Sequence, residues 1–137
     1  MKTKVITLLI VTGLLFGFQN NKSTEHAKIE KGMIKVAIYY PNAEGNTFDM
    51  DYYSNKHMPM AADLFGDSLK AMIIDKGLSV GASNEPVTYV AVGYFYFADM
   101  ATFQNSMSTH SETLKADVTN YTNILPAIQV SEVQTAQ

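Results

Sequence analysis

The chain has 137 residues, of which 17% are charged, and its formal net charge at pH 7 is −3. After removal of a short N-terminal segment, this length suffices for one domain of modest size. Basic residues form no run or stripe, so nucleic acids and anionic membrane surfaces are poor partners. The chain has no cysteine, which excludes disulfides and lipid attachment through a thiol.

The N-terminus has the pattern of an export signal. Lys2 and Lys4 precede an apolar run over residues 5–18, which is shorter than the roughly 20 residues that a membrane-spanning helix needs. We therefore predict an export signal over residues 1–19, a periplasmic or secreted mature protein, and no stable membrane insertion after cleavage. An uncleaved signal-anchor is the alternative. Residues 20–32 are predicted to form a polar linker, and residues 33–134 the domain.

The first part of the domain predicts a strand followed by a helix. Residues 33–40 alternate between two faces, which is typical of a strand. Thr47 is expected to cap the helix that follows, and this helix is expected to end at Gly66. Pro59 should interrupt the helix, because proline lacks a backbone donor and restricts the residue before it. His57 would then lie close to the carbonyl end of the first helical piece.

The second part predicts three more strands and a second helix, with the strands at residues 69–75, 87–97 and 124–133. Asp99 is expected to cap the N-terminus of this helix. Thr109 and Glu112 have the spacing of a capping box, so we expect the helix to restart midway. Pro126 indicates an edge or irregular position for the last strand.

The order of elements predicts a fold. It reads β-α-β followed by β-α-β, which is the ferredoxin-like arrangement, an α+β fold with a four-stranded antiparallel sheet. The strand at residues 87–97 is apolar or aromatic on both faces, so both faces of the sheet must be covered. The helices account for one face. We predict that a second copy of the chain covers the other, in a symmetric homodimer.

Two side chains that could carry out chemistry lie on the apolar face of the first helix. This face consists of positions three and four residues apart: Met50, Tyr53, His57, Met60 and Leu64. Side chains four apart on a helix are neighbours, so the Tyr53 phenol could reach the His57 imidazole or the same ligand. An imidazole readily exchanges a proton near neutral pH. His57 is therefore either the acid–base group of a pocket or a hydrogen-bonded histidine of the core.

The third strand carries small side chains between aromatic ones. Ala91 and Gly93 lie between Tyr89 and Phe95 on one face. They leave a hollow that a close-packed backbone, a large neighbouring side chain or a ligand could fill. A hollow of this kind would suit a small apolar or phenolic molecule. We predict His57 and Tyr53 as catalytic residues, and as substrate-binding residues Tyr40, Tyr89, Ala91, Gly93, Phe95 and His110.

The sequence contains no motif that predicts a cofactor. It has no glycine-rich phosphate loop, no nucleophile-elbow serine and no Cys/His cluster. A metal site made of His57, His110 and a carboxylate would have no supporting motif. We therefore expect neither a cofactor nor a metal, with haem bound through His57 as the alternative.

Several short motifs together point to a known family. These motifs are Tyr40-Pro41-Asn42, the run at residues 48–53, His57-Met58-Pro59, Asp75-Lys76-Gly77 and the run at residues 94–97. With these motifs the stretch from Ile34 to Val133 resembles the EthD family, within the dimeric α/β-barrel superfamily. The resemblance implies two ferredoxin-like subunits whose sheets join face to face.

The resemblance also suggests a function. The family is named for a component linked to ether-degrading monooxygenase systems. Similar proteins are loosely described as oxidoreductases, and others act in the tailoring of aromatic polyketides. The histidine that those proteins share looks like His57 here. The export signal departs from a family that looks mostly cytoplasmic, which argues against a role beside an intracellular electron-transfer chain.

Two functions of different classes follow. The first is a cofactor-independent oxidoreductase or proton-transfer enzyme that acts on a small apolar or aromatic compound, with His57 as general base or acid and Tyr53 orienting the substrate. The second is a non-catalytic small-molecule-binding or stress-related protein that holds apolar molecules in the barrel.

Overall fold

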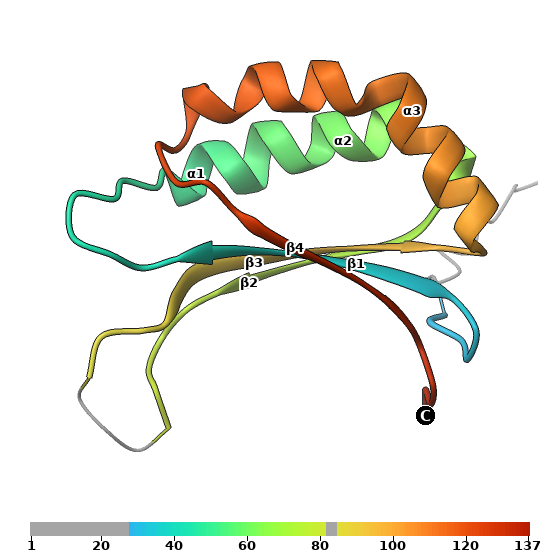
Figure 1. Cartoon of the computed structure of the whole chain (residues 1–137), viewed down its shortest axis with the longest axis horizontal. Coiled ribbons are helices and arrows are strands. Elements are labelled where there is room, and N and C mark those ends of the chain that lie inside the picture. Colours follow the sequence, from blue (N-terminus) through green and yellow to red (C-terminus); the bar gives the residue numbers. More distant parts are fainter. Residues whose placement is uncertain (1–27, 82–84) are drawn as a thin grey trace, which may run out of the picture.

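The computed structural model describes residues 28–81 and 85–137, so the predicted export signal and residues 20–27 of the predicted linker lie outside the described residues. In the described part, helices lie on one face of a four-stranded antiparallel sheet (Figure 1). The strands are β1 (Ile34–Pro41), β2 (Leu69–Lys76), β3 (Tyr89–Phe97) and β4 (Ala127–Glu132). None of the described helices has the length and hydrophobicity needed to span a bilayer.

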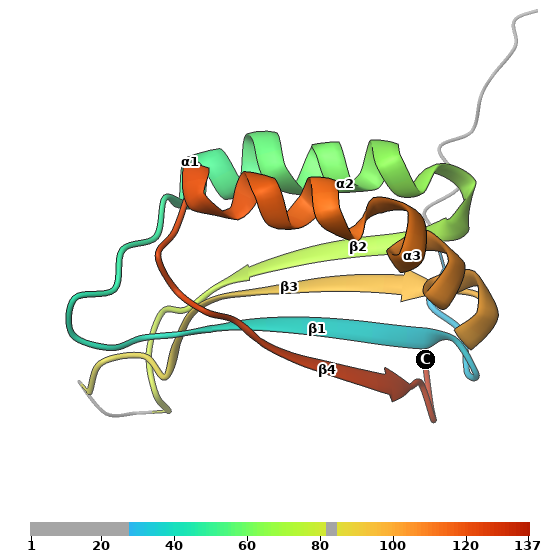
Figure 2. The same ribbon diagram turned by 45° about the horizontal axis from the view of Figure 1, so that its top comes forward.

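The order of the strands across the sheet is β2-β3-β1-β4, which confirms the ferredoxin-like fold predicted from the sequence (Figure 2). The last strand begins later than predicted. It starts directly after Pro126, because proline has no backbone N–H to contribute to a strand pairing. β4 lies at the edge of the sheet and pairs with β1, which confirms the position that Pro126 indicated.

The first helical segment is continuous from Met50 to Phe65. It comprises α1 (Met50–Tyr52), a π-helical turn η1 (Tyr53–His57) and α2 (Met58–Phe65). Asp49, and not the predicted Thr47, caps the N-terminus, since its carboxylate accepts a hydrogen bond of 2.9 Å from the backbone N–H of Tyr52. Gly66 ends the segment as predicted, with a φ of 51° that favours glycine.

Pro59 does not break the helix as the sequence suggested. Proline cannot donate to the carbonyl one turn before it, and its ring crowds that carbonyl. The chain meets this constraint by widening the preceding turn, so that the N–H of Met58 donates to the carbonyl of Tyr53, five residues back. The π-helical turn keeps both Tyr53 and His57 buried on the sheet side. Such turns are frequent at functional sites.

The second helix, α3 (Met100–Asp117), is one unbroken α-helix. Asp99 caps it as expected, accepting a hydrogen bond of 2.8 Å from the N–H of Thr102. The predicted restart at Thr109 does not occur. The Thr109 hydroxyl instead donates to the carbonyl of Asn105 inside an unbroken helix. A helical turn η3 (Val118–Asn120) follows α3 and leads into the segment before β4.

The hydrophobic core lies between the helices and the sheet. Phe65 of α2 packs edge-on against Phe95 and Phe97 of β3, with ring centroids 5.3 Å apart in both pairs. The opposite face of the sheet carries no helix within the described residues (Figure 1). On that face Ala37 and Tyr96 are buried by their neighbours, whereas Ile73 is 38% exposed.

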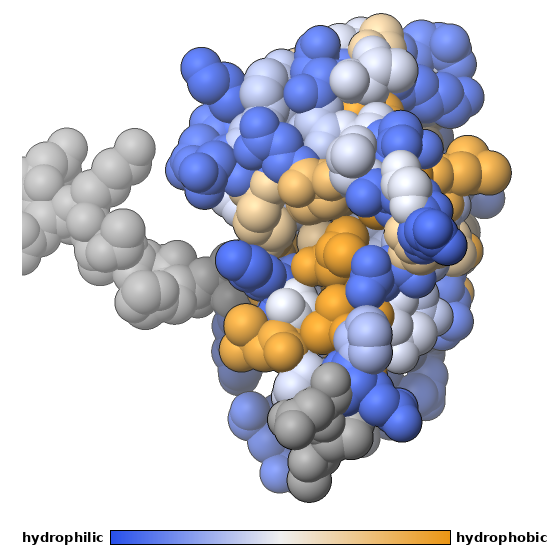
Figure 3. Space-filling view, turned by 90° about the vertical axis from the view of Figure 1, so that its left-hand side faces the viewer, coloured by the Kyte–Doolittle hydropathy of each residue, from blue (hydrophilic) through white to orange (hydrophobic). Residues whose placement is uncertain are grey.

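Apolar side chains also reach the surface at the end of the molecule that carries the β1–α1 and β2–β3 loops. From this side, hydrophobic patches are separated by hydrophilic residues (Figure 3). The most exposed large apolar residues of the described chain are Leu78, which follows β2, and Leu125, which precedes β4.

Candidate functional site

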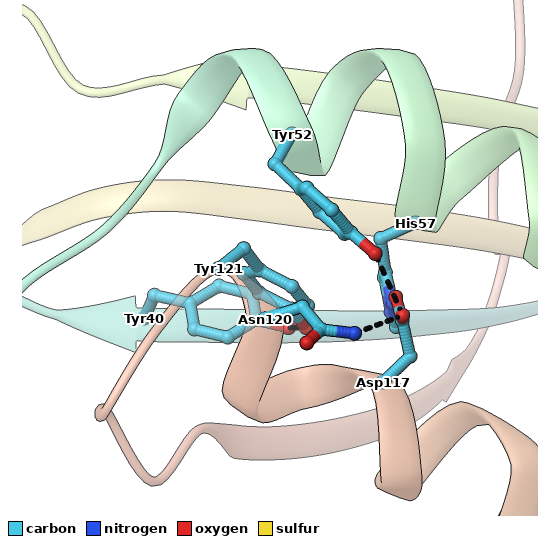
Figure 4. A network of polar contacts seen from close by, with 6 residues as sticks. All are labelled: Tyr40, Tyr52, His57, Asp117, Asn120 and Tyr121. Carbon is cyan, nitrogen blue, oxygen red and sulfur yellow. Dashed lines mark hydrogen bonds and ion pairs between the residues drawn. The ribbon is translucent and has the colours of Figure 1, made fainter.

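The candidate site is built around His57, the last residue of the π-helical turn. Its side chain is 8% exposed, and its Nδ1 atom lies 2.9 Å from Oδ2 of Asp117, at the end of α3. The two residues are 60 positions apart in the sequence. The contact therefore joins the two helical segments across the face of the sheet (Figure 4).

Asp117 is held by further hydrogen bonds. The Tyr52 hydroxyl donates to Oδ1 at 2.9 Å, and the Asn120 amide donates to the same oxygen at 2.8 Å. Tyr52 and Asn120 approach this carboxylate from different elements (Figure 4). Burial favours the neutral acid, but the hydrogen bonds from His57, Asn120 and Tyr52 outweigh it and lower the pKa of Asp117. The carboxylate is thus ionised near neutral pH.

This arrangement determines which nitrogen of His57 is basic. An ionised carboxylate accepts hydrogen bonds and cannot donate, so we assign the Nδ1 proton to the bond with Asp117. The Nε2 atom then carries the lone pair, and within the described residues no hydrogen bond reaches it. A histidine fixed in this way can take a proton at Nε2, and the carboxylate stabilises the imidazolium that results.

Two tyrosines lie beside the imidazole. The hydroxyls of Tyr40 and Tyr121 are 2.7 Å apart, and the Tyr121 ring lies 4.6 Å from the His57 ring, centroid to centroid. Burial raises the pKa of both phenols, so both stay protonated. A pair of neutral phenols has two protons and needs one for the bond between them. The second proton is available for a hydrogen bond to a ligand.

A cavity of about 300 Å³ adjoins these groups, between α3 and the sheet. His57, Tyr40 and Tyr121 contribute to its wall. Most of the remaining wall is apolar and comprises Val36, Ile38, Phe65, Phe95, Phe97, Phe103, Met107, Leu114, Val118, Pro126 and Ile128. This volume is at the lower end of the range for small-molecule sites, which fits a compound with one or two rings.

Three of the predicted site residues line this cavity, namely His57, Tyr40 and Phe95. The other predicted catalytic residue, Tyr53, is fully buried, and it is absent from the cavity wall. Its ring stacks on that of His57 at 5.7 Å, while its hydroxyl points at Gly93 and has no hydrogen-bond partner. The hollow predicted above Gly93 is therefore filled by a large neighbouring side chain, one of the three alternatives.

The remaining predicted binding residues lie outside the cavity wall. Ala91 is fully buried in the sheet, opposite Tyr40 in the strand register. Tyr89 is 39% exposed and packs on Tyr39. His110, on α3, contacts the edge of Phe65 with ring centroids 6.2 Å apart.

Sequence reasoning missed Asp117, the residue that holds His57. One signal was available: the carboxylate stands in the last turn of a helix, where the helix dipole disfavours negative charge. An acidic residue at such a position needs donors from elsewhere. Tyr52 and Asn120 were missed because their role depends entirely on where Asp117 lies.

The lowered pKa of Asp117 predicts an effect of pH on stability. Its folded-state pKa lies below the value of about 3.9 expected in the unfolded chain, so the carboxylate stabilises the fold above that pH. This contribution is lost as the pH falls through the folded pKa. We expect Asp117→Asn to lower the free energy of unfolding at pH 6, and this difference to shrink as the pH is lowered toward 3. Urea unfolding of both proteins across this pH range measures it, and a difference that stays constant would contradict the assignment.

Within the described residues, no three His, Asp or Glu side chains come together as a metal site would require. The groups that face the cavity can exchange protons and donate hydrogen bonds. These are the chemical capabilities of the site.

Comparison with solved structures supports the fold. An EthD-like protein from Ralstonia eutropha JMP134 is 37% identical, with a TM-score of 0.74, over 78% of this chain and 96% of that one. An EthD family protein from Bacillus halodurans C-125 is 18% identical, with a TM-score of 0.58, over 73% and 97% of the two chains. A candidate monooxygenase from Shewanella loihica PV-4, 9% identical, has the same fold, with a TM-score of 0.51 over 77% and 98% of the chains.

No functionally curated protein significantly matches the chain. The sequence model of the EthD domain matches residues 45–124, a span that includes both helical segments, His57 and Asp117. Together with the identity to the Ralstonia protein, this match establishes the relationship suggested by the short motifs. The chain belongs to the EthD domain family.

Proposed function

We propose that this protein transfers a proton to and from a small apolar or aromatic compound bound in the cavity, with His57 as the general base. The observation that carries the proposal is the contact of 2.9 Å between His57 Nδ1 and Asp117 Oδ2. It leaves Nε2 as the basic nitrogen of a residue in the cavity wall. A base oriented by a third group is the arrangement expected of acid–base catalysis.

The proton transfer can be written in full. The Nε2 lone pair takes a proton from an acidic C–H or O–H bond of the compound, and the electron pair of that bond stays on the compound as an anion. Asp117 stabilises the imidazolium through the Nδ1 hydrogen bond. Where the negative charge is delocalised onto an oxygen, the available proton of the Tyr40 and Tyr121 pair can hydrogen-bond to it. The reverse step returns the proton.

The same base would support oxidation if dioxygen enters the cavity. A carbanion formed by His57 can give its electrons to dioxygen and form a carbon–oxygen bond, and the imidazolium then returns its proton to yield a hydroperoxide. The substrate carbon is oxidised and dioxygen is reduced. On this basis we propose the protein as a cofactor-independent oxidoreductase in the presence of dioxygen.

Binding without turnover is the second candidate function, and the composition of the cavity wall favours it. Apart from a few polar groups, the wall is built from aliphatic and aromatic side chains. Such a wall would hold apolar molecules whether or not His57 reacts. The two functions differ in whether a bound compound loses a proton.

Exchange of an acidic C–H bond with solvent tests the proposal. A suitable probe is 2-tetralone, a two-ring ketone whose α-protons exchange for deuterium in D2O and can be followed by proton NMR. We expect the protein to accelerate this exchange above the buffer rate, and we expect naphthalene-2-carboxamide, which competes for the cavity, to suppress the acceleration. Binding of both compounds without any acceleration would contradict proton transfer and support the binding function.

We also propose that two copies of the chain associate through the sheet face opposite the helices. That face carries apolar and aromatic side chains of β3, among them Val92 at its centre. The helices cover the other face (Figure 1). Partly exposed apolar side chains such as Ile73 would be buried by a second sheet packed face to face.

Association can be tested by placing a charge on that face. Val92 lies opposite Asp75 in the strand register, so Val92→Glu puts two like charges side by side inside the proposed interface. We expect the unchanged protein to sediment as a dimer, and Val92→Glu to sediment as a monomer. Thr113→Glu, at an exposed position of α3, is the matched control and should remain dimeric. A monomeric unchanged protein would contradict the proposal.

A further inference from the structure

We propose that the compound bound in the cavity carries a carboxylate, which is held at the cavity mouth by Ser111 and Lys115 of α3. This inference rests on the cavity of the proposed function and adds the chemical class of the ligand. The ligand would then have an apolar body, a reactive end near His57 and an anionic end near the surface.

The polar groups of the cavity wall fall into two sets. One set surrounds the imidazole and consists of His57, Tyr40 and Tyr121. The other consists of Ser111 and Lys115, which lie four residues apart and are thus neighbours on one face of α3. Among the described residues that line the cavity there is no carboxylate, so Lys115 gives the wall a net positive charge.

Exposure places the second set at the mouth. The Lys115 side chain is 71% exposed, and Ile128 of β4, another residue of the wall, is 60% exposed. His57, by contrast, is almost fully buried. The wall therefore runs from an exposed cationic margin between α3 and β4 to a buried basic nitrogen.

Both groups of the second set are free to bind a ligand. Ser111 is half-buried and makes no hydrogen bond within the described residues. The Lys115 ammonium contacts Glu112 at 3.0 Å, but the Glu112 side chain is 89% exposed. An exposed pair of this kind is weak, so the ammonium can turn to a carboxylate seated at the mouth. A hydroxyl and an ammonium supply the donors that a carboxylate accepts.

The alternative is that the aliphatic stem of Lys115 covers the cavity and its charge has no effect on binding. Two probes of the same shape separate these possibilities: naphthalene-2-carboxylate and naphthalene-2-carboxamide. Their dissociation constants can be measured by titration calorimetry at low ionic strength and pH 7. We expect the carboxylate to bind about two- to fivefold more tightly than the amide, the factor that one partly exposed charge contributes.

Substitutions on α3 should change the affinity for naphthalene-2-carboxylate and leave the affinity for naphthalene-2-carboxamide unchanged. Lys115→Gln should remove the preference for the carboxylate, and Lys115→Arg should keep it. Ser111→Ala should also weaken binding of the carboxylate probe. Glu112→Gln should strengthen carboxylate binding, because it removes the competing partner of Lys115. Lys70→Gln, which makes the same charge change at an exposed position outside the cavity wall, should leave both probes unaffected.

Equal affinities for the two probes, or equal effects of Lys115→Gln on both, would overturn the inference. This test does not require the proposed catalysis. In His57→Gln, which lacks the proposed base, the ratio of the two affinities should be unchanged. If 2-tetralone exchange fails while the carboxylate preference holds, the proposed function is wrong and the ligand class stands. If exchange succeeds but the carboxylate preference is absent, the proposed function stands and the ligand class is wrong.

Discussion

Replacing His57 by glutamine is expected to slow the catalysed exchange of 2-tetralone by about 10²- to 10⁴-fold. Glutamine has a comparable reach and can still donate a hydrogen bond to Asp117. It has no basic nitrogen with which to accept a proton, so the variant should bind the ketone and fail to deprotonate it. Rates of deuterium incorporation at saturating 2-tetralone measure the effect.

The second histidine of the described chain provides a matched control. His110 is on α3, contacts Phe65 and is absent from the cavity wall. His110→Gln makes the same chemical change and should exchange 2-tetralone at the rate of the unchanged protein. Near-equal rates for His57→Gln and the unchanged protein would rule out His57 as the base. Circular dichroism of each variant establishes that both are folded.

Gly93→Ala is expected to destabilise the fold by about 3 kcal/mol, as for other overpacked cores. A Cβ at this position would overlap the hydroxyl oxygen of Tyr53, which presses on the strand from the helix above. Both residues are fully buried, so neither can move into solvent. For a domain of this size the melting temperature should fall by about 12 °C or more.

We attribute the destabilisation by Gly93→Ala to the clash with the Tyr53 hydroxyl, and removing this hydroxyl tests that cause. It is buried and has no hydrogen-bond partner, so Tyr53→Phe removes an unsatisfied polar atom and should cost little stability by itself. In the Tyr53→Phe background the Gly93→Ala change should be markedly less harmful, although the ring carbon that carries the hydroxyl remains close. A double-mutant cycle of thermal unfolding measures this coupling. Equal destabilisation by Gly93→Ala in both backgrounds would contradict it.

The architecture could be predicted because it depends on local patterns. Alternation over two residues marks β1 in the sequence, an apolar and aromatic run marks β3, and the spacing of apolar side chains marks the two helical segments. Asp99 and Gly66 signal a helix start and a helix end through hydrogen bonds and backbone angles within a few residues. Each of these features is decided by neighbours in the chain, so it can be read without knowing the fold.

Errors in the local prediction occurred where two signals competed. Thr109 and Glu112 have capping-box spacing, yet the helix continues through them because Thr109 bonds back to Asn105. Pro59 was expected to interrupt the helix, and the chain instead inserted a π-helical turn before it. In both cases packing of a continuous helix on the sheet outweighed a local preference.

By itself, the sequence determined the ferredoxin-like fold and singled out His57 as a residue to explain. The tertiary structure decided which residue holds His57 and where the Tyr53 hydroxyl points. The partner of His57 is Asp117, which comes from the other helical segment, and no periodicity relates two residues on different elements. Tyr53 has the same helical spacing as His57, yet its ring fills the space above Gly93 because that strand residue has no side chain. Distances between elements depend on how they pack, and packing is a property of the folded chain.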